Sequence, residues 1–331
     1  VLLLGTALMS IGSFLCYFSS NYVAVIISVF LIGIGVTAVQ IAGNPFIRVL
    51  DAPSRYTANL TMVIGIGALG YALSPLVVPV LQANGFSWKA IYLLIALVNI
   101  AILGIVACSR FPEAKSTQDE KLDLSRVWAL FRHPIVCTYA LGIFLYVGAE
   151  VGVSSYIITF MNSIHHLTNT QSFWAEDSFF YQLFPSKTAL IVALFWLLQA
   201  VGRMVASFLM HWMSEKKIFI FHSACTIVAL LCAMMGSESV SLVAFALVGY
   251  FTCVSFTSIF SAVINSFDRD HGMLSGLLGT AIVGGAFVGW LVGFVGNQWG
   301  MCVGMSINVL AFLYVFYLSV WGKGRLDVSD H

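Results

Sequence analysis

Long, nearly uninterrupted runs of apolar residues dominate the chain, and short polar segments separate them. About 20 helical residues cross the roughly 30 Å hydrocarbon core of a bilayer. Apolar and polar residues do not alternate within these runs, as they would in the strands of a membrane barrel. Lipid offers the backbone no hydrogen-bond partners, so the runs predict helices. We therefore expect an all-α polytopic membrane protein with ten transmembrane helices, at residues 1–18, 22–50, 60–82, 88–109, 134–161, 186–210, 217–236, 240–265, 272–297 and 301–321.

Composition supports this interpretation. Of 331 residues, 60% are hydrophobic and only 9% are charged, with a mean hydropathy of +0.96. Soluble domains carry about a quarter charged residues, so a soluble globular protein is excluded. The net charge is +1 and no basic run occurs, which argues against nucleic acid as a partner. The seven cysteines lie in apolar runs without a C-x-x-C pair, so we interpret them as small buried hydrophobic residues.

Basic residues predict the orientation, because loops on the cytoplasmic side carry an excess of Lys and Arg. With the charged connection around 110–133 placed inside, only Lys89 and Lys187 of the 15 basic residues fall outside, which leaves 13 inside. We therefore expect a multi-pass protein of the cytoplasmic (inner) membrane, with its C-terminus inside.

The same connection divides ten spans into four and six. Transporters are often built from equal repeated bundles, and the sequence begins within an apolar run. We therefore expect two further helices in front of this sequence. The predicted domains are an N-terminal bundle remnant with helices three to six at 1–110, a cytoplasmic inter-bundle loop at 111–133, a C-terminal six-helix bundle at 134–322 and a cytoplasmic tail at 323–331.

Glu150 is the one acidic residue of 14 in the middle of a span. A carboxylate at that depth costs about 2.5–3.5 kcal/mol, so it should face the bundle interior or a wet cavity. Tyr146 and Ser154 lie four residues before and after it, on the same helix face. We expect these three residues to bind substrate, and Glu150 to couple a proton, since burial favours a neutral carboxyl group. The alternative is a protonated Glu150 with a structural role.

A second polar stripe consists of Thr37, Gln40 and Asn44. Side-chain amides offer donors and an acceptor, which suits a solute with many hydroxyl groups, so Gln40 and Asn44 are candidate substrate ligands. Polar side chains also hold membrane helices together. Asn44 can instead satisfy carbonyl groups that Pro45 leaves free, and Pro45 itself predicts a kink that could act in gating.

Other residues in the spans suggest packing or gating. Arg203 could extend to the interface or pair with an acid on a neighbouring helix, in a structural or gating role. Trp196 could stack on the ring of a bound solute or pack in the core. Gly285 and Gly289 form part of a small-residue ridge, which allows close helix packing and sliding of the bundles.

No metal site is expected. The outer connection 162–186 contains His165, His166, Glu176 and Asp177, but adjacent histidines in a solvated loop are the more common explanation of this pattern.

Four segments together resemble the fucose:proton symporter family of the major facilitator superfamily. They are QIAGNPFIRVL at 40–50, SRYTANL at 54–60, LYVGAEVGVSSYI at 145–157 and FWLLQAVGR at 195–203. The glucose/galactose branch resembles this chain most, because it carries Gln where the chain has Gln40. The resemblance implies a twelve-helix, two-bundle major facilitator fold, with ten of the twelve helices (4 + 6) in this sequence.

The resemblance and the candidate residues together predict a secondary active transporter that moves a hexose or fucose-like sugar by alternating access. We expect a proton, or else sodium, as the coupling ion and no other cofactor. The partners expected are the sugar and the lipid bilayer, and the chain is expected to be monomeric and not an enzyme. A membrane-embedded sugar sensor, a carrier of another small polar solute and a membrane enzyme are the alternatives; an enzyme would need clustered catalytic groups, which the sequence lacks.

Overall fold

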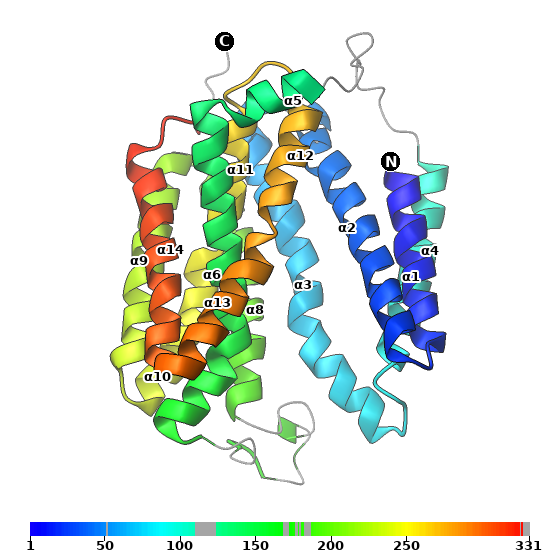
Figure 1. Cartoon of the computed structure of the whole chain (residues 1–331), viewed down its shortest axis with the longest axis vertical. Coiled ribbons are helices and arrows are strands. Elements are labelled where there is room, and N and C mark those ends of the chain that lie inside the picture. Colours follow the sequence, from blue (N-terminus) through cyan, green and yellow to red (C-terminus); the bar gives the residue numbers. More distant parts are fainter. Residues whose placement is uncertain are drawn as a thin grey trace. The chain divides into compact units, whose positions relative to one another are not determined.

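The computed structural model describes residues 1–50, 52–109, 124–167, 172–175, 178, 180–181, 187–324 and 326. Every regular element within these ranges is a helix (Figure 1). Nine of the described helical stretches are long and apolar enough to cross a membrane, and α1 (Leu2–Phe18) is a further apolar helix of 17 residues. Each of the ten predicted spans therefore corresponds to a helical stretch in the structure.

The contacts divide the chain into two compact units. The first comprises Val1–Leu50 and Val77–Arg126, with α1, α2 (Tyr22–Leu50), α4 (Ala90–Cys108) and the last part of α3 (Tyr56–Ala83). Glycines let α1 and α2 cross closely, because a Cβ atom on Gly35 would lie 2.6 Å from the Gly5 carbonyl oxygen. Small residues serve this purpose in membranes, where packing rather than the hydrophobic effect joins helices.

The second unit comprises Asp51–Leu76 and Val127–His331. The long helix α6 lies at its centre and contacts α8, α10, α11, α12, α13 and α14. Besides the first part of α3, the 3-10 turn η1 (Pro53–Arg55) and most of α5 (Leu124–Phe131), its helices are α6 (Pro134–His165), α8 (Lys187–Leu209), α9 (Glu215–Met235), α10 (Glu238–Thr252), α11 (Ser255–Ile264), α12 (His271–Ala281), α13 (Gly284–Trp299) and α14 (Met301–Trp321).

Two predicted spans differ from the expectation of one continuous helix each. The span at 240–265 consists of α10 and α11, and the span at 272–297 consists of α12 and α13. At the second break, the backbone N–H groups of Ile282 and Val283 donate to carbonyl groups three residues earlier, at 3.2 Å in both cases. Such tightened turns interrupt an α-helix without a proline.

Two further expectations need correction. The last third of the predicted loop 111–133 forms the helix α5 (Leu124–Phe131), while residues 110–123 lie outside the described ranges. All seven cysteines are free, but Cys16 and Cys253 alone are buried. Cys108, Cys137 and Cys232 are exposed, because a cysteine in an apolar helix can point outwards as readily as inwards.

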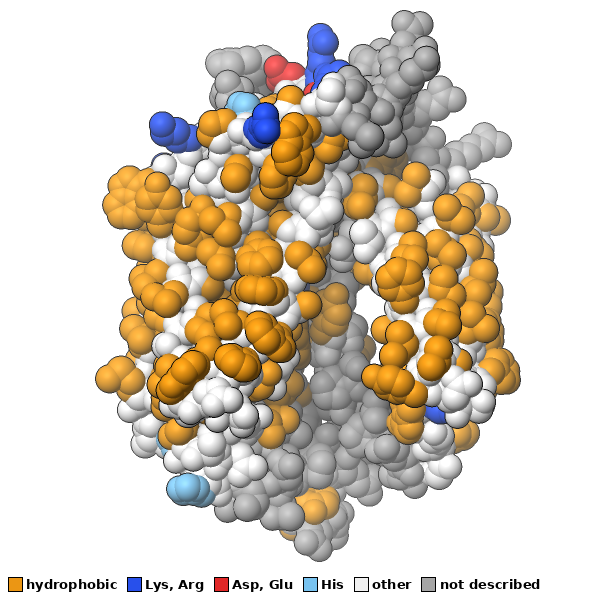
Figure 2. Space-filling view, in the orientation of Figure 1, with side chains coloured by type: hydrophobic (Ala, Val, Ile, Leu, Met, Phe, Trp, Pro, Cys, Tyr) orange, Lys and Arg blue, Asp and Glu red, His pale blue; other side chains and the backbone are white. Residues whose placement is uncertain are grey.

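The outer surface is apolar where a soluble protein would be charged. Figure 2 shows hydrophobic side chains over much of the described surface on the visible face, and most of the visible Lys and Arg side chains at one end. Exposed large hydrophobic residues occur along the helices, for example Phe30, Ile105, Val228 and Phe287. In water such a surface would be unfavourable, whereas lipid chains solvate it.

We predict that Gly284→Ala destabilises the protein, because a Cβ atom there would collide with the backbone carbonyl oxygen of Phe144. Overpacking of this kind costs about 1–3 kcal/mol. The thermal unfolding midpoint in detergent should fall. Gly276→Ala is the matched control, since a Cβ atom on that helical glycine meets nothing within 4 Å. Equal midpoints for the two variants would contradict the packing role of Gly284.

Candidate functional site

A carboxylate cluster is buried inside the second unit, around Glu150 of α6. The Glu150 side chain is 12% exposed, and its Oε1 atom receives every contact of the cluster. The Tyr146 hydroxyl lies 2.7 Å from it, the Gln199 amide donates a hydrogen bond to it, and Arg203 Nη2 lies 3.6 Å away. Glu150 Oε1 therefore has two hydrogen-bond donors and one cationic side chain beside it.

Helical periodicity places these groups. Tyr146 precedes Glu150 by four residues on α6, and Gln199 precedes Arg203 by four on α8, so each helix presents one face to the other. Small residues also bring α8 close to α10: a Cβ atom on Gly202 would lie 2.9 Å from the Tyr250 carbonyl oxygen. The cluster thus depends on close packing of three helices.

Two of these side chains also donate hydrogen bonds to backbone carbonyl groups at the break between α10 and α11. The Tyr146 hydroxyl lies 3.0 Å from the Thr252 carbonyl oxygen, and Arg203 Nε donates to the Cys253 carbonyl oxygen at 3.2 Å. Carbonyl groups freed from a helix inside a membrane need donors, because lipid supplies none. The ion pair and the helix break therefore share Tyr146 and Arg203.

Tyr146 has one hydroxyl hydrogen and two acceptors within reach, Glu150 Oε1 and the Thr252 carbonyl oxygen. With Glu150 charged, that hydrogen is drawn to the carboxylate. With Glu150 protonated, the carboxyl group can donate to the Tyr146 oxygen and the hydroxyl hydrogen can go to Thr252. The geometry thus permits two complete hydrogen-bond arrangements that differ by one proton on Glu150.

The first part of α3 covers this cluster within the same unit. A Cβ atom on Gly65 would lie 2.9 Å from Arg203 Cβ. Ser207 Oγ donates to the Ala58 carbonyl oxygen at 2.8 Å, and Thr61 Oγ1 donates to Thr257 Oγ1 at 2.8 Å. These polar contacts join α3 to α8 and to α11.

Trp196 lies one helical turn before Gln199 on α8. Its ring centroid is 5.3 Å from that of Tyr71 on α3, with the two planes tilted by 43°. Tyr71 is 55% exposed, so the pair presents aromatic surface outside the buried core. This partner of Trp196 was not foreseen from the sequence.

The other residues of the α6 stripe are arranged differently. Tyr146 is completely buried, so its ring has no open face and acts through its hydroxyl group. Ser154 Oγ donates to the Val151 carbonyl oxygen of its own helix at 3.3 Å. The structure therefore brings Tyr146 and Glu150 together, while it places Ser154 outside the hydrogen bonds of the cluster.

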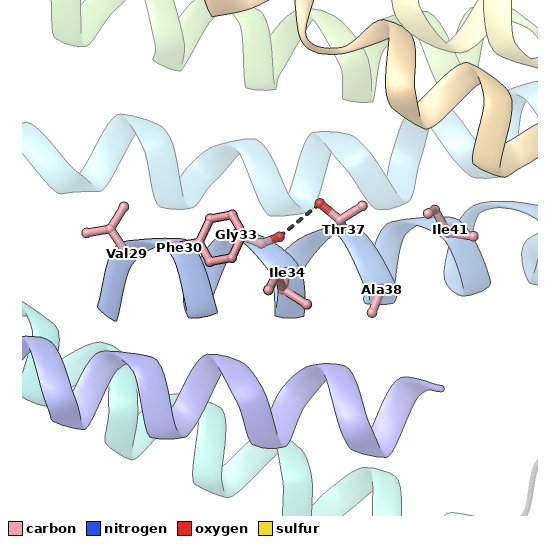
Figure 3. Close-up of a pocket in the computed structure, with 7 residues that line it drawn as sticks. All are labelled: Val29, Phe30, Gly33, Ile34, Thr37, Ala38 and Ile41. Atoms are coloured by element: carbon pink, nitrogen blue, oxygen red, sulfur yellow. Dashed lines mark hydrogen bonds between the residues drawn. The ribbon is translucent and has the colours of Figure 1, made fainter. Parts of the chain in front are cut away.

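In the first unit, α2 carries the second predicted stripe. Thr37 lines an open depression of about 620 Å³, and its hydroxyl group donates to the Gly33 carbonyl oxygen at 2.8 Å (Figure 3). Gln40 and Asn44 lie further along the helix and are half-buried. The helix continues through Pro45 to Leu50. The depression is lined by Val29, Phe30, Gly33, Ile34, Thr37, Ala38 and Ile41.

The glycine ridge of α13 packs on α6. Cβ atoms on Gly285 and Gly289 would lie 3.2 and 3.6 Å from methyl groups of Val151. The tightest approach to the backbone of α6 is at Gly284, where a Cβ atom would collide with the Phe144 carbonyl oxygen, and this glycine was not predicted to be a packing site. Sliding at this contact stays a prediction.

The outer histidines have ordinary roles where they are described. His165 Nε2 lies 2.9 Å from Ser241 Oγ, and His166 ends α6 with a positive φ of 54°. Glu176 and Asp177 lie outside the described residues. Within the described ranges, no group of three or more His, Cys, Asp or Glu side chains could hold a metal ion.

Two residues of the cluster, Gln199 and Thr252, were not predicted from the sequence. Gln199 carried a usable signal, because it is an amide in an apolar run, four residues before Arg203. Thr252 carried none, since its contribution depends on a helix break that no proline marks.

Comparisons with known proteins agree with this architecture. The model of the Major Facilitator Superfamily matches residues 1–281. A glucose/galactose transporter of Brucella abortus is 26% identical over 89% of this chain and 71% of its own length. The L-fucose-proton symporter of Escherichia coli is 23% identical over 89% of this chain and 71% of its length.

Among solved structures, the crystal structure of the Escherichia coli fucose:proton symporter with the N162A substitution is similar to this chain. The TM-score is 0.80 with 19% sequence identity, and the match covers 98% of this chain and 83% of the symporter. At this identity the match establishes the fold, which confirms the predicted major facilitator architecture.

We predict that Arg203→Gln lowers the free energy of unfolding by about 3–5 kcal/mol, because it leaves a buried carboxylate unpaired. The double variant Glu150→Gln, Arg203→Gln should recover part of the loss, since no buried charge remains. Thermal unfolding of both variants in detergent at neutral pH measures the difference. Equal losses would mean that the two side chains do not act as an ion pair.

Proposed function

The chain belongs to the Major Facilitator Superfamily, and we propose that it is a secondary active transporter of a monosaccharide, a hexose or fucose-like sugar, coupled to protons. Relatives named as a glucose/galactose transporter and an L-fucose-proton symporter support this substrate class. We further propose the cytoplasmic (inner) membrane as its location with the C-terminus inside, because 13 of 15 basic residues then lie on the cytoplasmic side.

The observation that carries the proposal is the buried Glu150 cluster. A carboxylate in a membrane-embedded helix marks an ion or substrate pathway far more often than a structural contact. Here it is paired with Arg203 and bonded to Tyr146, and both of these side chains also hold the break between α10 and α11. Gain or loss of one proton therefore changes the contacts of a discontinuous helix.

The proposed coupling step is protonation of Glu150. A proton that binds the carboxylate cancels its charge, so the attraction to Arg203 weakens. The carboxyl group then donates to the Tyr146 oxygen, while the Tyr146 hydroxyl hydrogen goes to the Thr252 carbonyl oxygen. Arg203 keeps its bond to Cys253 but loses its anionic partner.

The effect can extend to α3. Arg203 lies directly against Gly65, and the Ala58–Ser207 and Thr61–Thr257 hydrogen bonds join α3 to the same two helices as the cluster. Alternating access requires some helix contacts to break and reform in each cycle. We propose that the α3 contacts with α8 and α11 belong to this set and that the charge of Glu150 biases them.

For the sugar, we propose Gln40 and Asn44 of α2 as ligands for hydroxyl groups, and the Trp196–Tyr71 pair as aromatic surface for a ring face. The Gln40 amide is half-buried, so it can keep contact with a polar solute. Aromatic rings present an apolar face that suits the C–H groups of a pyranose. Ser154 and Glu150 remain proposed substrate contacts on α6, whereas the completely buried Tyr146 is proposed to act through Glu150 and not by touching the sugar.

We predict that Glu150→Gln abolishes proton-driven sugar accumulation in vesicles but leaves sugar exchange at equal concentrations measurable. The amide keeps the size of the side chain but cannot take up a proton. Uptake of labelled hexoses with and without a pH gradient distinguishes the two activities.

The matched control for that experiment is Glu238→Gln. Glu238 lies at the start of α10 and pairs with Lys187 at 3.2 Å, where the carboxylate is 41% exposed. This variant should accumulate sugar as the unmodified protein does. Normal gradient-driven accumulation by Glu150→Gln would remove Glu150 from the coupling step.

We predict that Gln40→Ala weakens sugar binding about fivefold or more with normal membrane insertion, because one charge-neutral hydrogen bond contributes about 1 kcal/mol. Binding of a hexose panel to the purified protein measures the effect. Asn99→Ala is the amide control in the same unit, since the Asn99 side chain bonds the Ile95 carbonyl oxygen of its own helix. Unchanged affinity for every hexose would assign Gln40 to helix packing.

A further inference from the structure

The short helix α5 carries an exposed aromatic face immediately before the long span α6. Trp128 and Phe131 stack with ring centroids 5.6 Å apart and planes 18° from parallel. The Arg132 guanidinium lies over the Trp128 ring, 5.0 Å from its centroid. The three residues follow at i, i+3 and i+4, so they share one face of the helix and its end.

This face is open although its rings are large. Trp128 is 55% exposed and Phe131 is 43% exposed. Figure 1 shows α5 across the end of α6 instead of in line with it. The helix begins ten residues before Pro134, the first residue of α6, so it lies where a membrane span meets the headgroup layer.

Other tryptophans mark the same end of the second unit. Trp212 follows the end of α8, and Trp321 is the last residue of α14, which are the ends that the chain direction places beside the start of α6. Together with Trp128 they are 55% to 68% exposed. Lys216 and Lys323 follow within a few residues of Trp212 and Trp321 and are exposed. Trp enrichment next to basic residues is typical of a membrane interface.

We propose that α5 lies in the headgroup layer of the inner leaflet and that its Trp128–Phe131–Arg132 face binds anionic phospholipid. The rings insert at the boundary between headgroups and acyl chains, where amphipathic helices place their apolar face. Arg132 lies at the level of the phosphates, which are negatively charged on the cytoplasmic surface. The inference depends on the proposed orientation and is independent of sugar transport.

The test uses the full chain, labelled with 5-fluorotryptophan, in bilayer nanodiscs of phosphatidylcholine with increasing phosphatidylglycerol. The ¹⁹F resonance that disappears in Trp128→Phe belongs to Trp128. We expect it to be broadened by a lipid with a spin label near the headgroup more than by an aqueous gadolinium chelate, and to shift as phosphatidylglycerol is added. A resonance broadened mainly by the aqueous chelate would overturn the insertion of α5.

The anionic preference has its own control. In Arg132→Gln the phosphatidylglycerol fraction at half-maximal shift should rise about fivefold, since one basic side chain near the surface accounts for about that factor in binding. Lys216→Gln removes the same charge from the start of α9 and should leave the midpoint unchanged. Two results would overturn the lipid site at Arg132: a ¹⁹F chemical shift that does not change with the phosphatidylglycerol fraction, or equal midpoints for the two variants.

Discussion

A buried carboxylate among membrane helices persists only where donors and a positive charge surround it, and this requirement organises the second unit. Lipid offers no partner, so every contact of Glu150 comes from within the protein. The requirement explains why Arg203, itself costly in an apolar span, is buried beside it. The attraction between the two charges offsets the cost of burying each of them, so removal of either side chain leaves an uncompensated buried charge.

The helix break between α10 and α11 adds a second requirement that the same side chains meet. Tyr146 and Arg203 each contact both Glu150 and a carbonyl group at the break. A group with two partners transmits a change at one of them to the other. This shared use makes the cluster better suited to a coupling step than an isolated ion pair, which could change its protonation state without consequence for the backbone.

The surface follows from the same physical contrast between lipid and water. Exposed apolar side chains cover the spans, whereas most of the visible Lys and Arg side chains lie where the spans end (Figure 2). The exposed aromatic face of the short helix α5 can be covered by lipid headgroups, so it needs no contact with other parts of the protein. Trp128, Trp212 and Trp321 are exposed and lie in or next to helix ends that the chain direction places at one end of the unit.

The sequence by itself determined the class of protein, the ten helical stretches and the candidate carboxylate, because span length and the cost of a buried charge depend on local residues alone. Four short segments also sufficed to indicate the family. Only the tertiary structure decided that Arg203 pairs with Glu150, that Gln199 and Thr252 join them, and that Tyr146 is buried with its ring closed off. Those outcomes depend on which faces of α6, α8 and α10 meet. Hydrophobic periodicity cannot specify them, since a membrane helix is apolar all round.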